Sequence, residues 1–229
     1  MGRGAKHIMS SEEFRIEEFV EGRGLSLLEL SHPEVIKISS HLLCDFHNNP
    51  VLSKRIEEHL ATQPGASLQF LEGMVLGKGG WIERAIELNK RLEGKIEYEP
   101  NRIQLERLYR ILSNEKNMER LRKELLEQGF PVVLGHNDVQ ELNFLYRYED
   151  RRNVYLIDFD FVGFGYRGVD IGSYFNESGL DNSYPRQPLY VAYPELCIDE
   201  NGQETFYKSY LEYFWEHYCE EEVSKEEFL

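Results

Sequence analysis

Cysteine is scarce in this sequence of 229 residues, and long apolar runs are missing. The three cysteines, Cys44, Cys197 and Cys219, are odd in number and widely spaced. They therefore predict neither a disulfide framework nor a zinc site, and they favour a reducing compartment. No apolar stretch approaches the ~18–20 residues of a membrane-spanning helix, and the N-terminus lacks the apolar core of a signal peptide. We therefore expect a cytoplasmic globular protein with no membrane span.

Basic residues are too few to balance the acidic ones. Lysine and arginine number 26 against 41 aspartates and glutamates, which gives a net charge of −15 at neutral pH. A chain of this charge repels the phosphates of nucleic acids and anionic lipids, so no nucleic-acid partner is expected. The same charge would not repel a small organic cation. With 41% hydrophobic residues, the chain has enough apolar material for a buried core.

Apolar periodicity predicts that most of the first half is helical. Gly129 followed by Pro131 is a helix stop signal, and Ser113-Asn114 resembles a cap. An aromatic stripe near the C-terminus, within 206–218, is expected to pack in the core rather than to form a cage around a cation. The expected helices cover 32–46, one or two segments within 68–86, 101–128 and 203–219. The expected strand at 14–20 is followed by a linker at 21–24.

The segment GHNDVQELNFLYRYEDRRNVYLIDFDF carries the chemistry. Short strands at 144–148 and 153–157 flank a polar turn, so a β-hairpin should bring Asp158 back beside the loop that holds Asp138 and Asn143. Phosphoryl transfer needs a carboxylate that accepts a hydroxyl proton, and oxygen ligands for Mg²⁺ on the nucleotide phosphates. The His-x-Asp pattern alone is common in polar turns. The pattern with an asparagine five residues on and an aspartate after the hairpin favours phosphoryl transfer.

The sequence HNDVQELNF resembles the phosphotransferase loop of the choline/ethanolamine kinase family. The run IDFDFVGFGYRGVDIGSYFNE is similar to that family's second signature, and RIEEFVEGR is similar to its inter-lobe hinge. The resemblance extends from about Phe14 to the C-terminus and is strongest over 135–177. It implies ATP-dependent phosphorylation of the hydroxyl of choline or ethanolamine, the first step of phosphatidylcholine or phosphatidylethanolamine synthesis. Mg²⁺, ATP and ADP, the amino alcohol and a second copy of the chain are the partners that it suggests.

By this resemblance, Asp138 is the catalytic base, and Asn143 and Asp158 hold Mg²⁺. Asp160 either assists the metal or caps the strand end, and Glu177 either faces the amino alcohol or is a solvated carboxylate. The remaining assignments place Gln140, Tyr166 and Glu177 at the substrate, the backbone near Glu18 and Val20 at the adenine, and His136 and Asp170 as braces of the loop. For His136, the brace is favoured over an acid or base.

The fold implied is α+β, a protein-kinase-like (aminoglycoside-phosphotransferase-like) C-lobe that is mostly helical with a small β-hairpin at the active site. Residues 1–24 would be a remnant of the N-lobe's last strand and the hinge, and residues 25–229 the C-lobe. A glycine-rich phosphate loop and a strand lysine are not found, so we expect little turnover from these 229 residues alone. A non-catalytic kinase-like interaction domain and another small-molecule kinase of the aminoglycoside-phosphotransferase-like class are the alternatives.

Overall fold

The computed structural model describes residues 7–11, 15–62, 80–92, 107, 110–111, 114–148, 154–186 and 190–219. Within them the helices are α1 (Leu27–Leu30), α2 (Pro33–His47), α3 (Pro50–Ala61), α4 (Trp81–Leu92), α6 (Glu115–Glu127), α7 (Arg167–Glu177) and α8 (Glu200–Tyr218). Two 3₁₀ turns are η2 (Glu141–Asn143) and η3 (Pro194–Leu196). The strands are β1 (His7–Ser10), β2 (Arg15–Glu17), β3 (Gly22–Gly24), β4 (Val132–Gly135), β5 (Phe144–Arg147), β6 (Val154–Leu156), β7 (Gly163–Tyr166), β8 (Leu180–Asp181) and β9 (Val191–Ala192).

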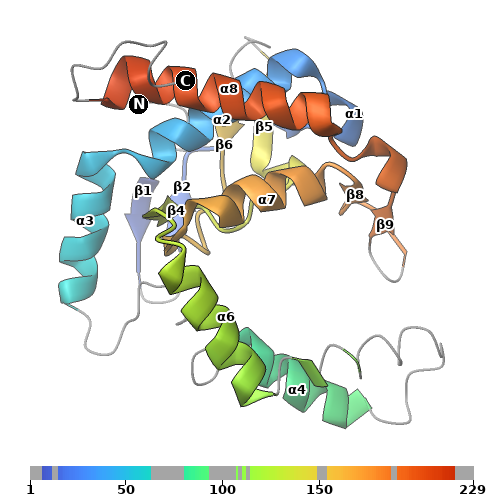
Figure 1. The fold of residues 1–229 in the computed structure, drawn as a ribbon. Helices are drawn as coiled ribbons and strands as arrows, with labels where there is room; N and C mark the ends of the chain where they lie inside the picture. Colours follow the sequence, from blue (N-terminus) through green and yellow to red (C-terminus); the bar gives the residue numbers. More distant parts are fainter. Residues whose placement is uncertain are drawn as a thin grey trace.

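The core lies where α2 and α8 pack side by side above α7 (Figure 1). Leu43 of α2, Tyr174 of α7 and Phe206 of α8 are completely buried there. The stripe of aromatic residues on α8 supplies much of this core, as the sequence predicted, because Phe206 and Tyr210 face α2 and α7 rather than solvent. The predicted helices at 32–46 and 203–219 are both confirmed, with ends shifted by one to three residues.

The strands form small antiparallel sheets, and two of these position the candidate site. The predicted hairpin is confirmed: β5 pairs with β6, with Phe144 opposite Leu156. The short apolar run at 132–134 forms strand β4, and its partner is β7, with Gly135 opposite Gly163. The alternating apolar pattern did not reveal β7, because its sequence GFGY has two glycines and no branched residue.

The glycine-rich segment that was expected to be a linker is instead strand β3, so that prediction was wrong. Gly22 pairs with Arg147, and Gly24 pairs with Leu145, which makes β3 the edge of the sheet β3-β5-β6. Glycine is required here for close approach, since a Cβ atom on Gly22 would clash with the carbonyl oxygen of Tyr146. The glycines that suggested flexibility therefore allow tight strand pairing.

Replacing Gly22 with alanine should destabilise the protein by about 1–3 kcal/mol, because the added methyl group must push β3 away from β5. Gly172 is the matched control, since a Cβ atom on it would meet nothing within 4 Å. Gly172→Ala in α7 should be neutral or stabilising by up to about 1 kcal/mol. Urea denaturation of both variants tests this. Equal stability of the two variants would contradict the close approach at β3.

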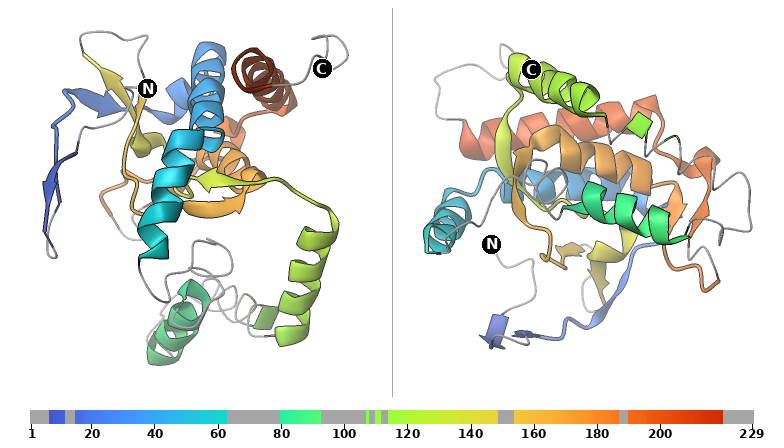
Figure 2. Two further views of the ribbon diagram at one scale, coloured as in Figure 1. Left: turned by 90° about the vertical axis from the view of Figure 1, so that its left-hand side faces the viewer. Right: turned by 90° about the horizontal axis from the view of Figure 1, so that it is seen from below.

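The remaining predicted elements are partly confirmed. Helix α6 begins after Asn114, whose side chain accepts a hydrogen bond from the Asn117 N–H at 3.3 Å, and it stops before Gly129, which has a φ of 62°. Most of the expected helix over 101–113, and the expected helical segment over 68–79, lie outside the described residues. The strand predicted at 14–20 is described as strand only over 15–17, and it pairs with β1 in a hairpin that projects from one side of the body (Figure 2).

Candidate active site

The loop that follows β4 holds the predicted base at the surface of a buried framework. Val133 and Leu134 anchor β4 in the interior, and His136 is fully buried at the start of the loop. Asn137 then adopts a positive φ of 63°, a conformation that is rare for a residue with a side chain. Its side-chain nitrogen donates to the carbonyl oxygen of Phe161 at 2.9 Å, which ties the loop to the turn after Asp158. Asp138, the next residue, is only partly buried.

The carboxylate of Asp138 is oriented by two side-chain amides. Asn143 Nδ2 donates to Asp138 Oδ2 at 2.9 Å and to the Asp138 carbonyl oxygen at 2.8 Å. Gln140 Nε2 donates to the same Oδ2 atom at 3.3 Å. Both contacts fix the position of Asp138 through Oδ2. A carboxylate held in this way is pre-positioned to accept a proton from a nearby hydroxyl.

The hairpin β5–β6 brings Asp158 next to this loop. The N–H of Ile157 donates to the carbonyl oxygen of Asn143 at 3.0 Å, and the carbonyl oxygen of Ile157 accepts from His136 Nε2 at 2.9 Å. Asp158 follows directly, is exposed, and has a φ of 64°. Strained backbone of this kind costs roughly 1–3 kcal/mol and concentrates at functional sites. The hairpin therefore joins the segment that leads to Asp158 to the loop that holds Asp138 and Asn143 through backbone contacts of Ile157.

The oxygen atoms offered here suit Mg²⁺. Asn143 uses its side-chain nitrogen to hold Asp138, which leaves its amide oxygen available, and Asp158 directly follows the residue whose N–H donates to the Asn143 carbonyl oxygen. Mg²⁺ prefers oxygen ligands and keeps several waters or substrate phosphates rather than filling its shell from the protein. Within the described residues, no three His, Cys, Asp or Glu side chains form a metal cage. One amide and one carboxylate fit an ion that is also bound by nucleotide phosphates.

Asp170 and His136 support the loop from inside. The two oxygens of Asp170 accept the backbone N–H groups of His136 and Asn137, each at 2.7 Å. Burial lowers the pKa of His136, despite the opposing charges of Asp170, Asp138 and Asp158. The neutral ring donates through Nε2 to Ile157, and its buried Nδ1 atom has no partner among the described residues. This arrangement links the start of the loop to Ile157, the residue before Asp158.

A second set of carboxylates lies near Asp138, and part of it was not recognised from the sequence. Asn182 donates its backbone N–H to Glu141 Oε1 at 2.8 Å, and its side-chain nitrogen to Glu141 Oε2 at 3.1 Å and to Glu177 Oε2 at 2.8 Å. Burial raises the pKa of Glu177, the hydrogen bond from Asn182 lowers it, and the charges of Glu141 and Asp138 raise it further. The cluster is strongly negative and would attract an organic cation.

Similarity to known proteins identifies the family of this chain. The family model described as choline/ethanolamine kinase matches residues 2–228. The chain belongs to the choline/ethanolamine kinase family. Mouse choline kinase alpha is 31% identical over 221 residues, which cover 93% of this chain and 43% of the relative. Human choline/ethanolamine kinase is 29% identical over 87% of this chain and 45% of the relative. The chain therefore spans less than half the length of these relatives.

Solved structures show the same fold at lower identity. An ethanolamine kinase from Plasmodium vivax matches with a TM-score of 0.62 at 22% identity, over 92% of this chain and 53% of that structure. A choline kinase from Cryptosporidium parvum matches with a TM-score of 0.59 at 20% identity, over 94% of this chain and 58% of that structure. The chain thus has the α+β, protein-kinase-like fold of the family. None of its described helices is both long and apolar enough to cross a membrane.

Tyr166 is one residue of the family pattern that the structure does not bring to Asp138. It pairs with Val132 at the start of β4, whereas the loop that holds Asp138 follows the other end of that strand. Its ring lies edge-on to Phe130 at 6.3 Å. It also lines an apolar groove of about 300 Å³ between α6 and α7, together with Leu121, Leu125, Phe130, Pro131, Gly168 and Val169. In this structure Tyr166 contributes to that groove.

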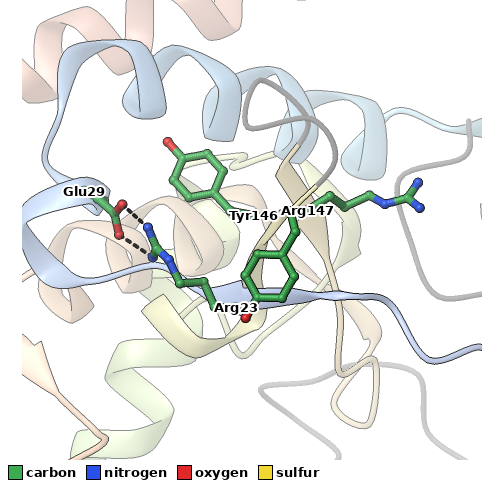
Figure 3. Close-up of a pocket in the computed structure, with 5 residues that line it drawn as sticks. Arg23, Glu29, Tyr146 and Arg147 are labelled. Atoms are coloured by element: carbon green, nitrogen blue, oxygen red, sulfur yellow. Dashed lines mark hydrogen bonds and ion pairs between the residues drawn. The ribbon is translucent and has the colours of Figure 1, made fainter.

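The hinge residues of the family pattern, Glu18 and Val20, lie between β2 and β3, and Glu18 is exposed. A pocket of about 200 Å³ is found nearby, at the end of β5 that is remote from Asn143 (Figure 3). Arg23 and Glu29 face each other in it, with contacts of 2.7 Å and less, while Arg147 points away (Figure 3). The hydrogen bond from Arg23 lowers the pKa of Glu29 to about 2. Because Arg23 is already paired with Glu29, its charge is not available to bind a phosphate group in this pocket.

The raised pKa of Glu177 gives a stability test. Because the folded protein binds this proton more tightly than the unfolded chain, ionised Glu177 is a cost that is present at neutral pH and absent below its ordinary pKa. Glu177→Gln should therefore stabilise the protein at pH 7, by only about 0.5 kcal/mol, since solvent screens this half-exposed side chain. The gain should vanish near pH 4. Urea denaturation at both pH values, with exposed Glu119→Gln as the control, measures it. A gain that grows as the pH falls would contradict the assignment.

Proposed function

We propose that this chain carries the base and the metal ligands of a kinase that transfers the γ-phosphoryl group of ATP to the hydroxyl of choline or ethanolamine. The observation that carries the proposal is that Asn143 contacts both segments of the site. Its side chain donates to Asp138, and its carbonyl oxygen accepts from Ile157, the residue before Asp158. The family's two signatures supply the same residues. The proposed C-lobe spans 25–229, and 1–24 represents the end of the other lobe and the hinge.

In this proposal, Asp138 orients the alcohol and takes up its proton as the oxygen attacks the phosphorus. Asn143 and Gln140 keep the carboxylate fixed during the step, so no reorganisation is needed when charge develops. Bound Mg²⁺ would offset the negative charge of the phosphates. Asn143 and Asp158 would hold that ion, and the backbone near Glu18 and Val20 would contact the adenine.

The carboxylates at the far side of Asp138 would bind the positive end of the substrate. Glu177 and Glu141 share Asn182 as a hydrogen-bond donor, and their negative charge is only partly compensated by it. Burial raises the pKa of Glu177, and the charges of Glu141 and Asp138 raise it further; a quaternary or primary ammonium near them would offset that repulsion. This gives the amino alcohol a defined orientation, with its hydroxyl toward Asp138. A cytoplasmic location and a homodimer remain predictions from the sequence.

A chimera provides the test. Residues 135–177 of this chain would replace the aligned segment of mouse choline kinase alpha, and ADP release would be measured with choline and with ethanolamine. The relative supplies the rest of its own chain, so the assay asks only whether the grafted site is competent. We expect turnover with at least one of the two alcohols. A chimera that binds nucleotide but turns over neither alcohol would contradict the proposal and favour a non-catalytic kinase-like domain.

A further inference from the structure

A buried chain of side chains connects α8 to the catalytic loop through two other helices. Tyr210 of α8 contacts His47 Nδ1 through its hydroxyl at 2.9 Å, and His47 Nε2 contacts Asp170 Oδ2 at 2.9 Å. Tyr210, His47 and Asp170 expose only 2%, 4% and 1% of their surfaces. His47 lies at the end of α2, so the three groups join α8, α2 and α7. No signature of the sequence had pointed to His47 or Tyr210.

The chemistry of the partners sets the direction of these hydrogen bonds. Asp170 is ionised, because hydrogen bonds from His47 and from the loop N–H groups outweigh the effect of burial and lower its pKa. An ionised carboxylate only accepts, so His47 must donate through Nε2. The hydroxyl of Tyr210, which burial keeps protonated by raising its pKa, can then donate to the other ring nitrogen, Nδ1. Asn48 Nδ2 donates in turn to that hydroxyl at 3.2 Å.

This series of hydrogen bonds ends at the backbone of His136 and Asn137, the two residues before Asp138. Asp170 Oδ2 is shared by His47 Nε2 and the N–H of His136, while Oδ1 accepts the N–H of Asn137. Asn137 has the positive φ of 63°, and a backbone of this kind persists only where its surroundings hold it. The two backbone N–H groups bind one carboxylate oxygen each, and both belong to the loop itself, so they tie Asp170 to the loop but not to the helical core. A third donor from a rigid helix fixes its position and charge relative to the core.

We infer that His47 is a positioning residue for Asp138, acting through Asp170, and that Tyr210 holds the His47 ring in place through its contact with Nδ1. Only the expected effect on catalysis rests on the proposed role of Asp138. The structural link itself can be measured without turnover. Loss of the link should loosen the catalytic loop while the α2–α8 core remains intact.

The experiment uses NMR of the isotope-labelled 229-residue chain. The amide N–H groups of His136 and Asn137 report on Asp170, and the side-chain amide of Asn143, which donates to Asp138, reports on the base itself. In His47→Leu, hydrogen exchange at these two backbone amides should accelerate about tenfold or more, relative to the amides of Leu43 and Phe206 in the core. The Asn143 side-chain signals should shift. Uniform acceleration across α2, α7 and α8 would overturn the inference.

Two conservative variants keep the test decisive if His47→Leu does not fold. His47→Gln places an amide N–H where it can reach Asp170, so it should restore the protection of the His136 and Asn137 amides. Tyr210→Phe removes only a hydroxyl, so the ¹⁵N shift of His47 Nδ1 should change while Nε2 keeps its hydrogen bond to Asp170. Unchanged ring shifts in Tyr210→Phe, or no rescue by glutamine, would overturn the inference. Failure of the chimera assay would leave these readouts unaffected.

Discussion

Replacing Asp170 with asparagine should destabilise the protein by about 3–5 kcal/mol, the largest stability effect that we expect from a single substitution. The reason is that a buried amide cannot accept three hydrogen bonds as the carboxylate does, and its NH₂ group would face either a backbone N–H or His47 Nε2–H. Urea denaturation measures the loss. Asp181→Asn, which keeps an oxygen that can accept from Ser183, should stay within about 0.5 kcal/mol of the unchanged protein.

The pH dependence of the free energy of unfolding tests independently whether Asp170 is ionised. The folded state lowers the pKa of Asp170, so its stabilisation is present above the ordinary aspartate pKa and is lost as the pH falls through the lowered value. The difference in stability between the unchanged protein and Asp170→Asn should therefore narrow below about pH 4. A difference that is constant from pH 7 down to acid unfolding would contradict the ionised, hydrogen-bonded carboxylate.

Asp138→Asn in the chimera should lower kcat by about 10²–10⁴-fold, because the amide cannot take the proton of the attacking hydroxyl. The affinity for nucleotide should change little, since Asp138 acts on the alcohol in the transition state rather than on bound ATP. Steady-state kinetics and a nucleotide titration measure the two effects. Asn176→Ala, on the exposed face of α7, is the control and should keep normal turnover. A fall in nucleotide affinity with unchanged kcat would place Asp138 at the metal instead.

Local patterns allowed much of the site to be predicted. The hairpin is encoded by two short strands around a polar turn, and pairing of consecutive strands brings Asp158 beside Asn143 without any distant contact. The helix stop at Gly129 is likewise local, because glycine adopts the positive φ at no steric cost. Such features depend on neighbours in the sequence, and the sequence was sufficient for them.

The features that the sequence did not reveal depend on distant contacts. His47 and Asp170 are 123 residues apart, so neither the spacing nor the periodicity of α2 distinguishes His47 from an ordinary core histidine. Gly22–Gly24 resembled a linker, because only the approach of Tyr146 makes the missing side chains necessary. The assignment of Tyr166 came from its place in a family signature. Its position at the far end of β4 follows from the register with Val132, which no pattern specified.

We propose that Asn143 and Asp158 hold a metal ion beside Asp138. Paramagnetic broadening by Mn²⁺, which accepts the same oxygen ligands as Mg²⁺, tests it most directly on the labelled chain in the presence of ADP. At low Mn²⁺ the amide signals of residues 138–143 and 157–159 should broaden first, Mg²⁺ should reverse the effect, and Asp158→Ala should abolish it. Broadening centred on another acidic part of the chain, or unchanged in Asp158→Ala, would contradict the claim.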